Sequence, residues 1–449
     1  MACTDFIAVI HLGTSRLTGI LGQNNEAGTL TIVACETENP AGCIRRGCVY
    51  NVRETASKVK RIIQKMESRI PGNRIGKIYV GVGGQSIRSI EHTICRSMDT
   101  EQMVTDEIKD RLLEEAWTCK PEGLDILSVV PSAYYLDKQY EFDPAGVSCT
   151  SIEAVYQIIV ARPSVRKRIV ECVTEQVKTD IAGIIPSPLA LAGVVLSEDD
   201  RKRGCALVDF GGGATSLAIY KNGRLAGLCV IPLGGNLITA DISEYLGISL
   251  SDAEKLKQKY ANAIADQDDG TTLQANTEDS EPLTFKLSGF NAVVEARLQE
   301  ILENIYSRLE PFAAKDLRAG IIITGNAAQI ENLTAVIYDR MKIDVRYASV
   351  RKDLTVKSNL PDISALEIAG PLGLLLAGNV DCLASPAVRQ PVIAAVPGKP
   401  EVKTETAPAE EPGKADDNPK ARQGRKQNNL LKKINEKANQ FVGDIFSES

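Results

Sequence analysis

The chain has 449 residues, of which 43% are hydrophobic and 24% charged, the composition of a soluble globular protein with two domains. A net charge of −6 and an aromatic content of only 5% exclude the basic, aromatic-rich surface of a nucleic-acid-binding protein. Eleven scattered cysteines without a Cys-x-x-Cys pair, together with two histidines, indicate thiols in a reducing cytosol rather than disulfides or a zinc site.

A strand, a glycine turn and a second strand are predicted over residues 7–21, and the same unit recurs at residues 205–220. In the second copy, three successive glycines can adopt positive φ and expose their N–H groups as a concave nest for a phosphate. Superposition of the two units places His11 on Asp209. The repeat predicts two related domains that face a shared cleft. A chance similarity of two hairpins, with Asp209 capping its own turn, is the alternative.

Apolar periodicity and turn residues predict further helices and strands. Thr105 is the expected N-cap of a helix whose apolar stripe ends at Trp117. Residues 266–282 are polar and rich in turn formers, so we expect a loop there. The other expected elements are a turn at 24–28, a helix at 52–68, strands at 77–82, 126–130 and 155–160, helices at 166–177 and 237–245, a helix capped by Ser249 or Ser251, an amphipathic helix at 291–309, a buried strand and turn at 320–328, and segments at 337–345 and 363–379.

The composition changes at residue 384. Seven prolines between Pro386 and Pro419, mixed with charged residues, predict a disordered linker over 384–427 that leads to an amphipathic, basic helix at 428–446. No apolar run reaches the roughly 18 residues of a spanning helix, and no basic flank marks a signal peptide, so we expect peripheral contact with an anionic membrane surface. A partner-binding helix, or one that packs back on its own domain, is the alternative. The residues expected at the membrane are Leu430, Leu431, Lys432, Lys433, Ile434, Lys437, Phe441, Val442, Ile445 and Phe446.

Taken together, these segments resemble the actin/Hsp70/sugar-kinase superfamily and, within it, the FtsA family of bacterial cell-division proteins. Residues 10–15 and 208–215 are similar to the two phosphate hairpins of the superfamily, and residues 321–328 to its adenosine motif. Residues 252–257 are similar to the FtsA helix that lines the adenosine pocket, and residues 128–146 to the subdomain inserted in FtsA. The tail helix behind a variable linker also matches this family.

The resemblance implies an α/β, actin-like two-domain fold with a nucleotide cleft. The expected parts are the core of the first domain at 1–83 and 163–203, the inserted subdomain at 84–162, the core of the second domain at 204–236 and 313–383, its smaller subdomain at 237–312, the disordered linker at 384–427 and the membrane-targeting amphipathic helix at 428–446.

The resemblance also implies ATP and Mg²⁺ as cofactors, with Asp209 positioning the metal through water. By the same resemblance, Arg297 contacts the C-terminal peptide of FtsZ, although it can equally be a solvated helix charge. No catalytic residue is expected. The residues expected to surround the nucleotide are Gly13, Thr14, Ser15, Arg16, Asp209, Gly211, Gly212, Gly213, Ala214, Thr215, Gly234, Gly235, Asn236, Glu254, Lys257, Gly325, Asn326 and Ala327.

The chain departs from the superfamily pattern at two positions. A carboxylate is usual where this chain has His11, and a second glycine where it has Asn326. An imidazole cannot replace a carboxylate as an oxygen ligand of Mg²⁺, so we expect ATP to bind and to be hydrolysed weakly at most. His11 can alternatively be a core histidine at a strand end, and Asn326 a turn residue with positive φ.

By the resemblance, we expect an ATP-binding, actin-like cell-division protein that polymerises and recruits later divisome proteins. It would tether FtsZ filaments to the cytoplasmic face of the inner membrane at the division septum. An actin-like assembly ATPase of the PilM or MreB type and a sugar-kinase-like phosphotransferase are the alternatives. A phosphotransferase needs a general base at a substrate hydroxyl, and no segment stands out as one. Neither assembly type accounts for the linker followed by this tail helix.

Overall fold

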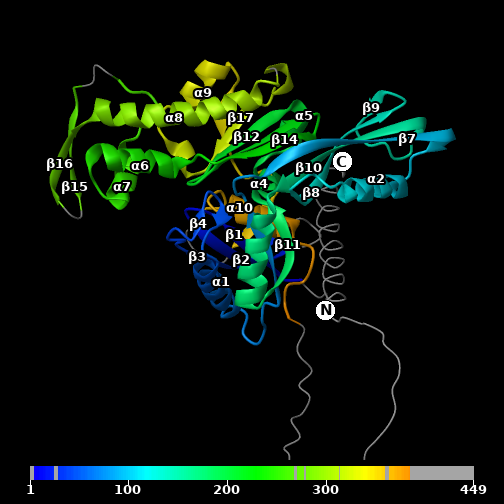
Figure 1. Ribbon diagram of the computed structural model, residues 1–449, viewed down its shortest axis with the longest axis horizontal. Coiled ribbons are helices and arrows are strands. Elements are labelled where there is room, and N and C mark those ends of the chain that lie inside the picture. Colours follow the sequence, from blue (N-terminus) through cyan, green and yellow to red (C-terminus); the bar gives the residue numbers. More distant parts are fainter. Residues whose placement is uncertain are drawn as a thin grey trace, which may run out of the picture.

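The computed structural model describes residues 5–24, 29–266, 270–277, 280–312, 314–358 and 364–384. Two mixed sheets dominate the molecule, and Figure 1 shows the larger one lying across the top of a lower domain. Residues 25–28 of the turn expected at 24–28, the linker expected at 384–427 except its first residue, and the tail helix lie outside the described residues. Among the described helices, none is both long and apolar enough to cross a membrane.

The first domain is built on a six-stranded sheet. Its strands in spatial order are β11 (Asp180–Pro186), β6 (Lys77–Val82), β1 (Ile7–Leu12), β2 (Leu17–Asn24), β3 (Thr29–Glu38) and β19 (Thr355–Ser358). The helices packed with it are α1 (Val52–Glu67), α3 (Pro163–Val170) with its π-helical continuation η1 (Glu171–Val177), α4 (Ser187–Val195) and α10 (Ala369–Ala377). A small hairpin, β4 (Ile44–Arg45) with β5 (Cys48–Val49), lies against the segment that follows β6, where the N–H of Gln85 donates to the carbonyl of Arg46.

The second sheet has nine strands. In spatial order they are β18 (Val345–Tyr347), β17 (Ile321–Thr324), β12 (Cys205–Phe210), β13 (Thr215–Lys221), β14 (Arg224–Ile231), β7 (Arg88–Met103), β10 (Ser148–Ala161), β8 (Asp125–Leu136) and β9 (Gln139–Glu141). Its other elements are α2 (Asp106–Thr118), α5 (Glu198–Arg203), α6 (Gly235–Leu246), α7 (Leu250–Tyr260), the hairpin β15 (Thr272–Thr277) and β16 (Ser280–Lys286), α8 (Leu287–Leu309), η2 (Ala314–Asp316), η3 (Asn326–Gln329) and α9 (Leu333–Met341).

The two sheets repeat one topology, as the paired hairpins predict. In the first sheet, β1 lies between its antiparallel partner β2 and the parallel strand β6, where His11 pairs with Gly81. In the second, β12 lies between antiparallel β13 and parallel β17, where Asp209 pairs with Thr324. His11 and Asp209 therefore occupy corresponding positions at the ends of the two central strands.

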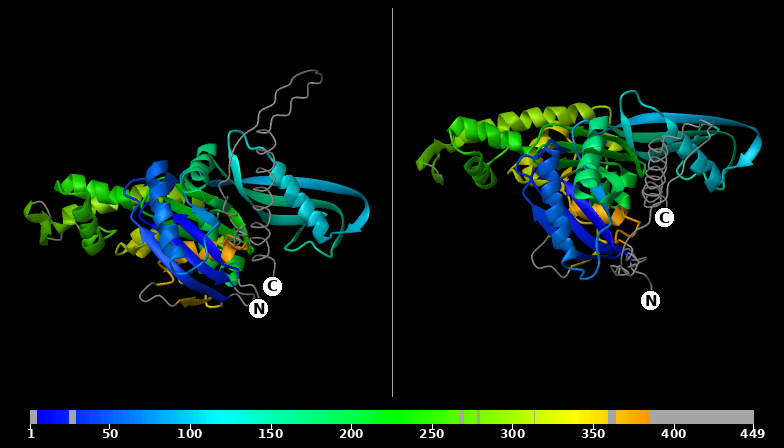
Figure 2. Two further views of the ribbon diagram at one scale, coloured as in Figure 1. Left: turned by 90° about the horizontal axis from the view of Figure 1, so that it is seen from below. Right: turned by 60° about the horizontal axis from the view of Figure 1, so that its bottom comes forward.

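The inserted subdomain consists of β7 to β10 with α2. Strand β7 joins β14 through a single residue pair, Cys229 with Arg88, so the insert extends the sheet of the second domain, although it interrupts the first domain in sequence. Figure 2 shows it projecting on the side opposite the β15–β16 hairpin. Thr105 is the N-cap residue of α2 as expected, but its side chain makes no capping hydrogen bond. The strands expected at 126–130 and 155–160 are longer in both cases.

Two expectations about the chain beyond residue 260 are wrong. Residues 266–282 are not simply a loop, because β15 and β16 pair within and beyond them, with Leu273 opposite Phe285. Phe285 is buried against Phe290 of α8, so the apolar residues of this hairpin cover the end of that helix. The assignment of residues 313–383 to the second domain fails in its last part, because β19 pairs with β3 of the first sheet.

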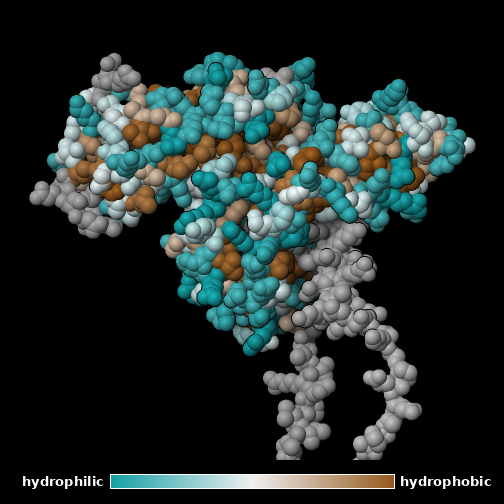
Figure 3. Space-filling view, viewed as in Figure 1, coloured by the Kyte–Doolittle hydropathy of each residue, from teal (hydrophilic) through white to brown (hydrophobic). Residues whose placement is uncertain are grey.

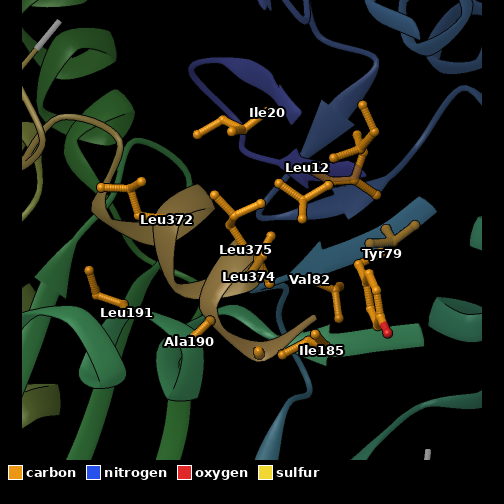
Figure 4. Packing of buried hydrophobic residues seen from close by; sticks show 14 of the residues in the cluster. Leu12, Ile20, Tyr79, Val82, Ile185, Ala190, Leu191, Leu372, Leu374 and Leu375 are labelled. Carbon is orange, nitrogen blue, oxygen red and sulfur yellow. The ribbon is translucent and has the colours of Figure 1, made fainter. Parts of the chain in front are cut away.

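Helix α10 lies in the core of the first domain, which Figure 4 shows from close by. Its leucines, including Leu372 and Leu375, are fully buried. They pack between the β1–β2 hairpin and α4, where Figure 4 labels Ala190 and Leu191. A side chain at Gly373 would collide with the carbonyl oxygen of Ala190, so glycine permits the close approach of the two helices. Since both helices are apolar all round, they must be enclosed on every side.

Candidate functional site

A cleft of about 740 Å³ separates the two domains. Its walls come from the turn after β1, the turn after β12, the end of β17, helix α7 and the first turns of α4 and α10. Figure 3 shows mainly hydrophilic residues over the lower domain and a mixed surface across the upper one. Because its walls include the turns after β1 and β12, the cleft lies at the carboxyl ends of parallel strands from both sheets, the usual place for a ligand in an α/β protein.

The glycine turns of the two hairpins touch each other across this cleft. None of Gly211, Gly212 and Gly213 has a positive φ, which corrects the reason expected for their presence. Glycine is needed here for close approach: a Cβ at Gly213 would lie 2.5 Å from the hydroxyl oxygen of Thr14. A Cβ at Gly212 would overlap the hydroxyl of Ser15. The absence of side chains on the second turn therefore lets the first turn rest against it.

The β4–β5 hairpin fixes the first turn from outside. The backbone N–H of Gly47 donates to the hydroxyl oxygen of Thr14 at 2.8 Å. Gly47 has a φ of 71°, and a side chain there would collide with the backbone of Gly83. Both glycines line the cleft. Sequence reasoning did not place either of them at the site, although Gly83 directly follows the strand expected at 77–82.

Helix α6 supports the second turn from behind. Gly235 N–H donates to the carbonyl of Gly211 at 3.0 Å, and Asn236 N–H donates to that of Gly212 at 2.8 Å. A side chain at Gly234 would collide with the same carbonyls. The remaining second-turn residue, Thr215, is buried and its hydroxyl donates to the carbonyl of Leu233. Five of the residues expected around the nucleotide therefore do not line the cleft, whereas all the others do; the five are Thr215, Gly234, Gly235, Asn236 and Ala327.

Lys257 connects α7 to α6 at one end of the cleft. Its ammonium donates to the carbonyl of Gly235 at 3.1 Å, to the hydroxyl of Thr239 at 2.8 Å and to a carboxylate oxygen of Glu254 at 2.6 Å. Burial opposes ionisation of Glu254, but hydrogen bonds from Lys257 and Thr239 outweigh it and hold its pKa below the ordinary value. This network uses all three ammonium donors and gives the wall of the cleft a fixed shape.

His11 and Asp209 lie at the floor of the cleft, one on each domain. Burial lowers the pKa of His11 to about 4 and raises the pKa of Asp209 to about 6, because both environments disfavour charge. Gly325 has a φ of 91°, and a Cβ there would lie 2.5 Å from Oδ1 of Asp209. Asn326 does not have a positive φ, so that interpretation of it is wrong.

Arg297 is not a solvated helix charge. Its guanidinium donates to both carboxylate oxygens of Asp241 on α6, at 2.6 and 3.0 Å, and also pairs with Glu300. The hydrogen bond to Asp241 raises the pKa of the guanidinium. A bidentate pair of this kind holds α8 against α6 and keeps Arg297 about three-quarters buried, with its side chain 26% exposed.

Two sheets of one topology, each ending in a glycine turn on its side of a shared cleft, define an actin-like two-domain protein. The fold is similar to that of a PilM–PilN type IV pilus biogenesis complex, with a TM-score of 0.55 and 15% identity over 82% of this chain and 97% of that one. Residues 206–369 match the family described as cell division protein FtsA, and residues 84–160 match the SHS2 domain inserted in FtsA.

Curated relatives agree with this match. The cell division protein FtsA of Porphyromonas gingivalis is 33% identical over 77% of this chain and 73% of its own length. The FtsA of Bacillus subtilis is 28% identical over 76% of this chain and 78% of its own length. The chain therefore belongs to the FtsA family of cell-division proteins.

Proposed function

We propose that this actin-like cell-division protein binds ATP in the cleft between its two domains. The observation that carries the proposal is the contact of two glycine turns from opposite domains at one cleft, because such turns present backbone N–H groups to phosphates. The Lys257–Glu254 network would adjoin the nucleoside. The cleft volume is within the range of small-molecule sites.

The residues present suit Mg²⁺ only in company with the nucleotide. Among the described residues, no three His, Cys, Asp or Glu side chains gather at one point, so these residues by themselves build no metal cage. Asp209 supplies one carboxylate at the cleft floor. Mg²⁺ commonly uses one carboxylate, water and the phosphates of its nucleotide, and Asp209 would hold it in this way through water.

A nucleotide bound between the domains would act mainly as a clamp. Ligand at 100 times its dissociation constant stabilises the folded state by about 2.7 kcal/mol. The first domain has an imidazole, His11, where a carboxylate would help to order the ligands around Mg²⁺. We therefore propose an ATPase activity that is weak at most. The protein would then use ATP to set the domain arrangement in which copies of the chain form filaments.

We further propose that these filaments tether FtsZ to the cytoplasmic face of the cell membrane at the division septum and recruit later divisome proteins there. Membership of the FtsA family and the basic amphipathic sequence at 428–446 support this. The C-terminal peptide of FtsZ would dock on the small subdomain near α8. Because Arg297 already pairs with Asp241, its contribution to that contact includes holding α8 in position.

Two experiments test the proposal. Calorimetric titration of the full-length protein with ATP and Mg²⁺ should show one site per chain, and absence of binding would refute the nucleotide claim. Sedimentation with vesicles containing anionic lipid should retain the full chain and lose a variant that ends at residue 427. A truncated protein that still sediments would refute the tether.

A further inference from the structure

The wall of the cleft that belongs to the first domain contains two polar side chains that the proposed ATP site leaves unused. Strands β1, β6 and β11 are adjacent and parallel. Their carboxyl ends carry His11, Gly83 and Ser187 respectively, and all three residues line the cleft. They lie on the opposite side of the cleft floor from Asp209.

Ser187 is the first of these side chains. The residue is only 8% exposed, and its hydroxyl makes no hydrogen bond to any described part of the chain. It stands beside Gly83, where a Cβ would be 3.8 Å from the hydroxyl oxygen. A buried hydroxyl without a partner destabilises the fold, and such a group needs an explanation. A ligand in the cleft would supply the missing partner.

His11 is the second. Its ring fits against three positions without side chains, Gly13, Gly81 and Gly370, with Nε2 3.7 Å from the Cβ position of Gly370. No hydrogen bond joins the ring to another described residue. The low pKa of His11 keeps the imidazole neutral at physiological pH, so it has one N–H donor and one acceptor available.

Two helix N-termini meet at the same place. Helix α4 begins at Ser187 and α10 begins at Ala369, and the first residues of both line the cleft. The contact of Gly373 with Ala190 holds the two helices side by side. Each has nine residues, so each N-terminus carries a partial positive charge that favours an anion, although Pro188 and Pro371 have no N–H and the N–H of Ala369 donates to the carbonyl of Leu366.

We propose that His11 and Ser187, together with the N-termini of α4 and α10, form a subsite for a terminal phosphoryl group. The inference rests on the proposed ATP site and assigns a part of it: direct hydrogen bonds from the first domain select the triphosphate over the diphosphate. The neutral imidazole donates to a phosphoryl oxygen, and the Ser187 hydroxyl donates to another. The first domain thereby distinguishes bound ATP from bound ADP, although it has the imidazole of His11 in place of a carboxylate that would order the ligands of a metal ion.

The test compares affinities of the full-length protein for ADP and for a non-hydrolysable ATP analogue, each with and without Mg²⁺. Variants Ser187→Ala and His11→Ala should each lose about tenfold in affinity for the analogue and less than twofold for ADP, because only the terminal phosphate loses a charged hydrogen bond. Ser57→Ala removes an exposed hydroxyl from α1 and should change neither constant. Ser187→Thr keeps the hydroxyl and should restore analogue binding.

Outcomes separate this inference from the proposal on which it rests. A wild-type protein that binds neither nucleotide refutes the ATP site itself. Equal losses for ADP and the analogue, or no loss for either, overturn the subsite alone. ADP binding by a variant shows that it is folded. If one alanine variant fails this control, the other alanine variant decides, by its loss of affinity for the ATP analogue relative to its loss for ADP.

Inorganic phosphate distinguishes a free phosphate from the γ-phosphate as the occupant. Added to the ADP-bound protein, it should raise the melting temperature of the wild type and leave Ser187→Ala unchanged. Equal rises in both proteins place phosphate elsewhere and overturn the assignment of Ser187. A rise in the wild type without any preference for the ATP analogue overturns the selection of the triphosphate.

Discussion

His11 and Asp209 should give the protein two opposite dependences of stability on pH, which single substitutions separate. The pKa of His11 falls from 6.5 to about 4 on folding, so His11 contributes stability that is present above pH 6.5 and lost as the pH falls through 4. The pKa of Asp209 rises from 3.8 to about 6, so its contribution is present below pH 3.8 and lost as the pH rises through 6. In the wild type the two effects largely cancel between pH 4 and 6.5.

The magnitudes follow from the two shifts. At about 1.4 kcal/mol per pKa unit, each pKa shift corresponds to about 3 kcal/mol of stability. Because both side chains are partly exposed, solvent screening reduces the expected contribution to about 2–3 kcal/mol. Relative to the wild type, His11→Asn should therefore gain about 2–3 kcal/mol as the pH falls from 7 to 4. Asp209→Asn should show the opposite trend and gain by a similar amount as the pH rises from 4 to 7.

Urea unfolding measured across this pH range, without nucleotide or Mg²⁺, gives the differences directly. The opposite signs serve as an internal control, since a general effect of substitution at the cleft would displace both curves in one direction. Parallel curves for all three proteins would show that folding shifts the pKa of neither His11 nor Asp209, and would refute the reasoning.

Two further predictions concern the cleft and helix α8. Gly212→Ala forces the two glycine turns apart, so ATP affinity measured by titration should fall at least about tenfold. The control is Gly270→Ala, whose added Cβ has no heavy atom within 4 Å and which should bind ATP as the wild type does. An unchanged affinity in Gly212→Ala would contradict the close packing of the turns. Arg297→Ala should lower the free energy of unfolding by about 1 kcal/mol, and a double-mutant cycle with Asp241→Ala should show coupling between the two; strict additivity would mean that the ion pair contributes nothing.

Local patterns in the sequence were enough for the repeated units and for most helices. Strand, glycine turn and strand follow from alternation and from glycine spacing, and Ser249 caps α7 as one of the two expected serines. The amphipathic helix at 291–309 is present, with Val294 and Leu298 buried as its periodicity predicts. These features depend on residues within a few positions of one another, so the sequence order already contains them.

Features that depend on distant pairing were not accessible in this way. Strand β19 pairs with β3, which lies more than 300 residues earlier in the chain, and nothing in the local sequence of residues 355–358 predicts this partner. The hairpin at 272–286 is polar enough to look like a loop, and only the packing of Phe285 on α8 gives it a buried face. Ser187 lies in an unremarkable Pro-Ser-Pro segment until three parallel strand ends bring it beside Gly83.

The glycine turn at 211–213 shows where the two kinds of information meet. The sequence by itself determined that a tight turn follows β12 and that a related turn follows β1. Only the tertiary structure decided why the glycines are there: not for positive φ, but because Thr14 and Ser15 approach too closely for any side chain. The physical reason is that a backbone preference is a local property, whereas the space available to a Cβ depends on what the rest of the chain places beside it.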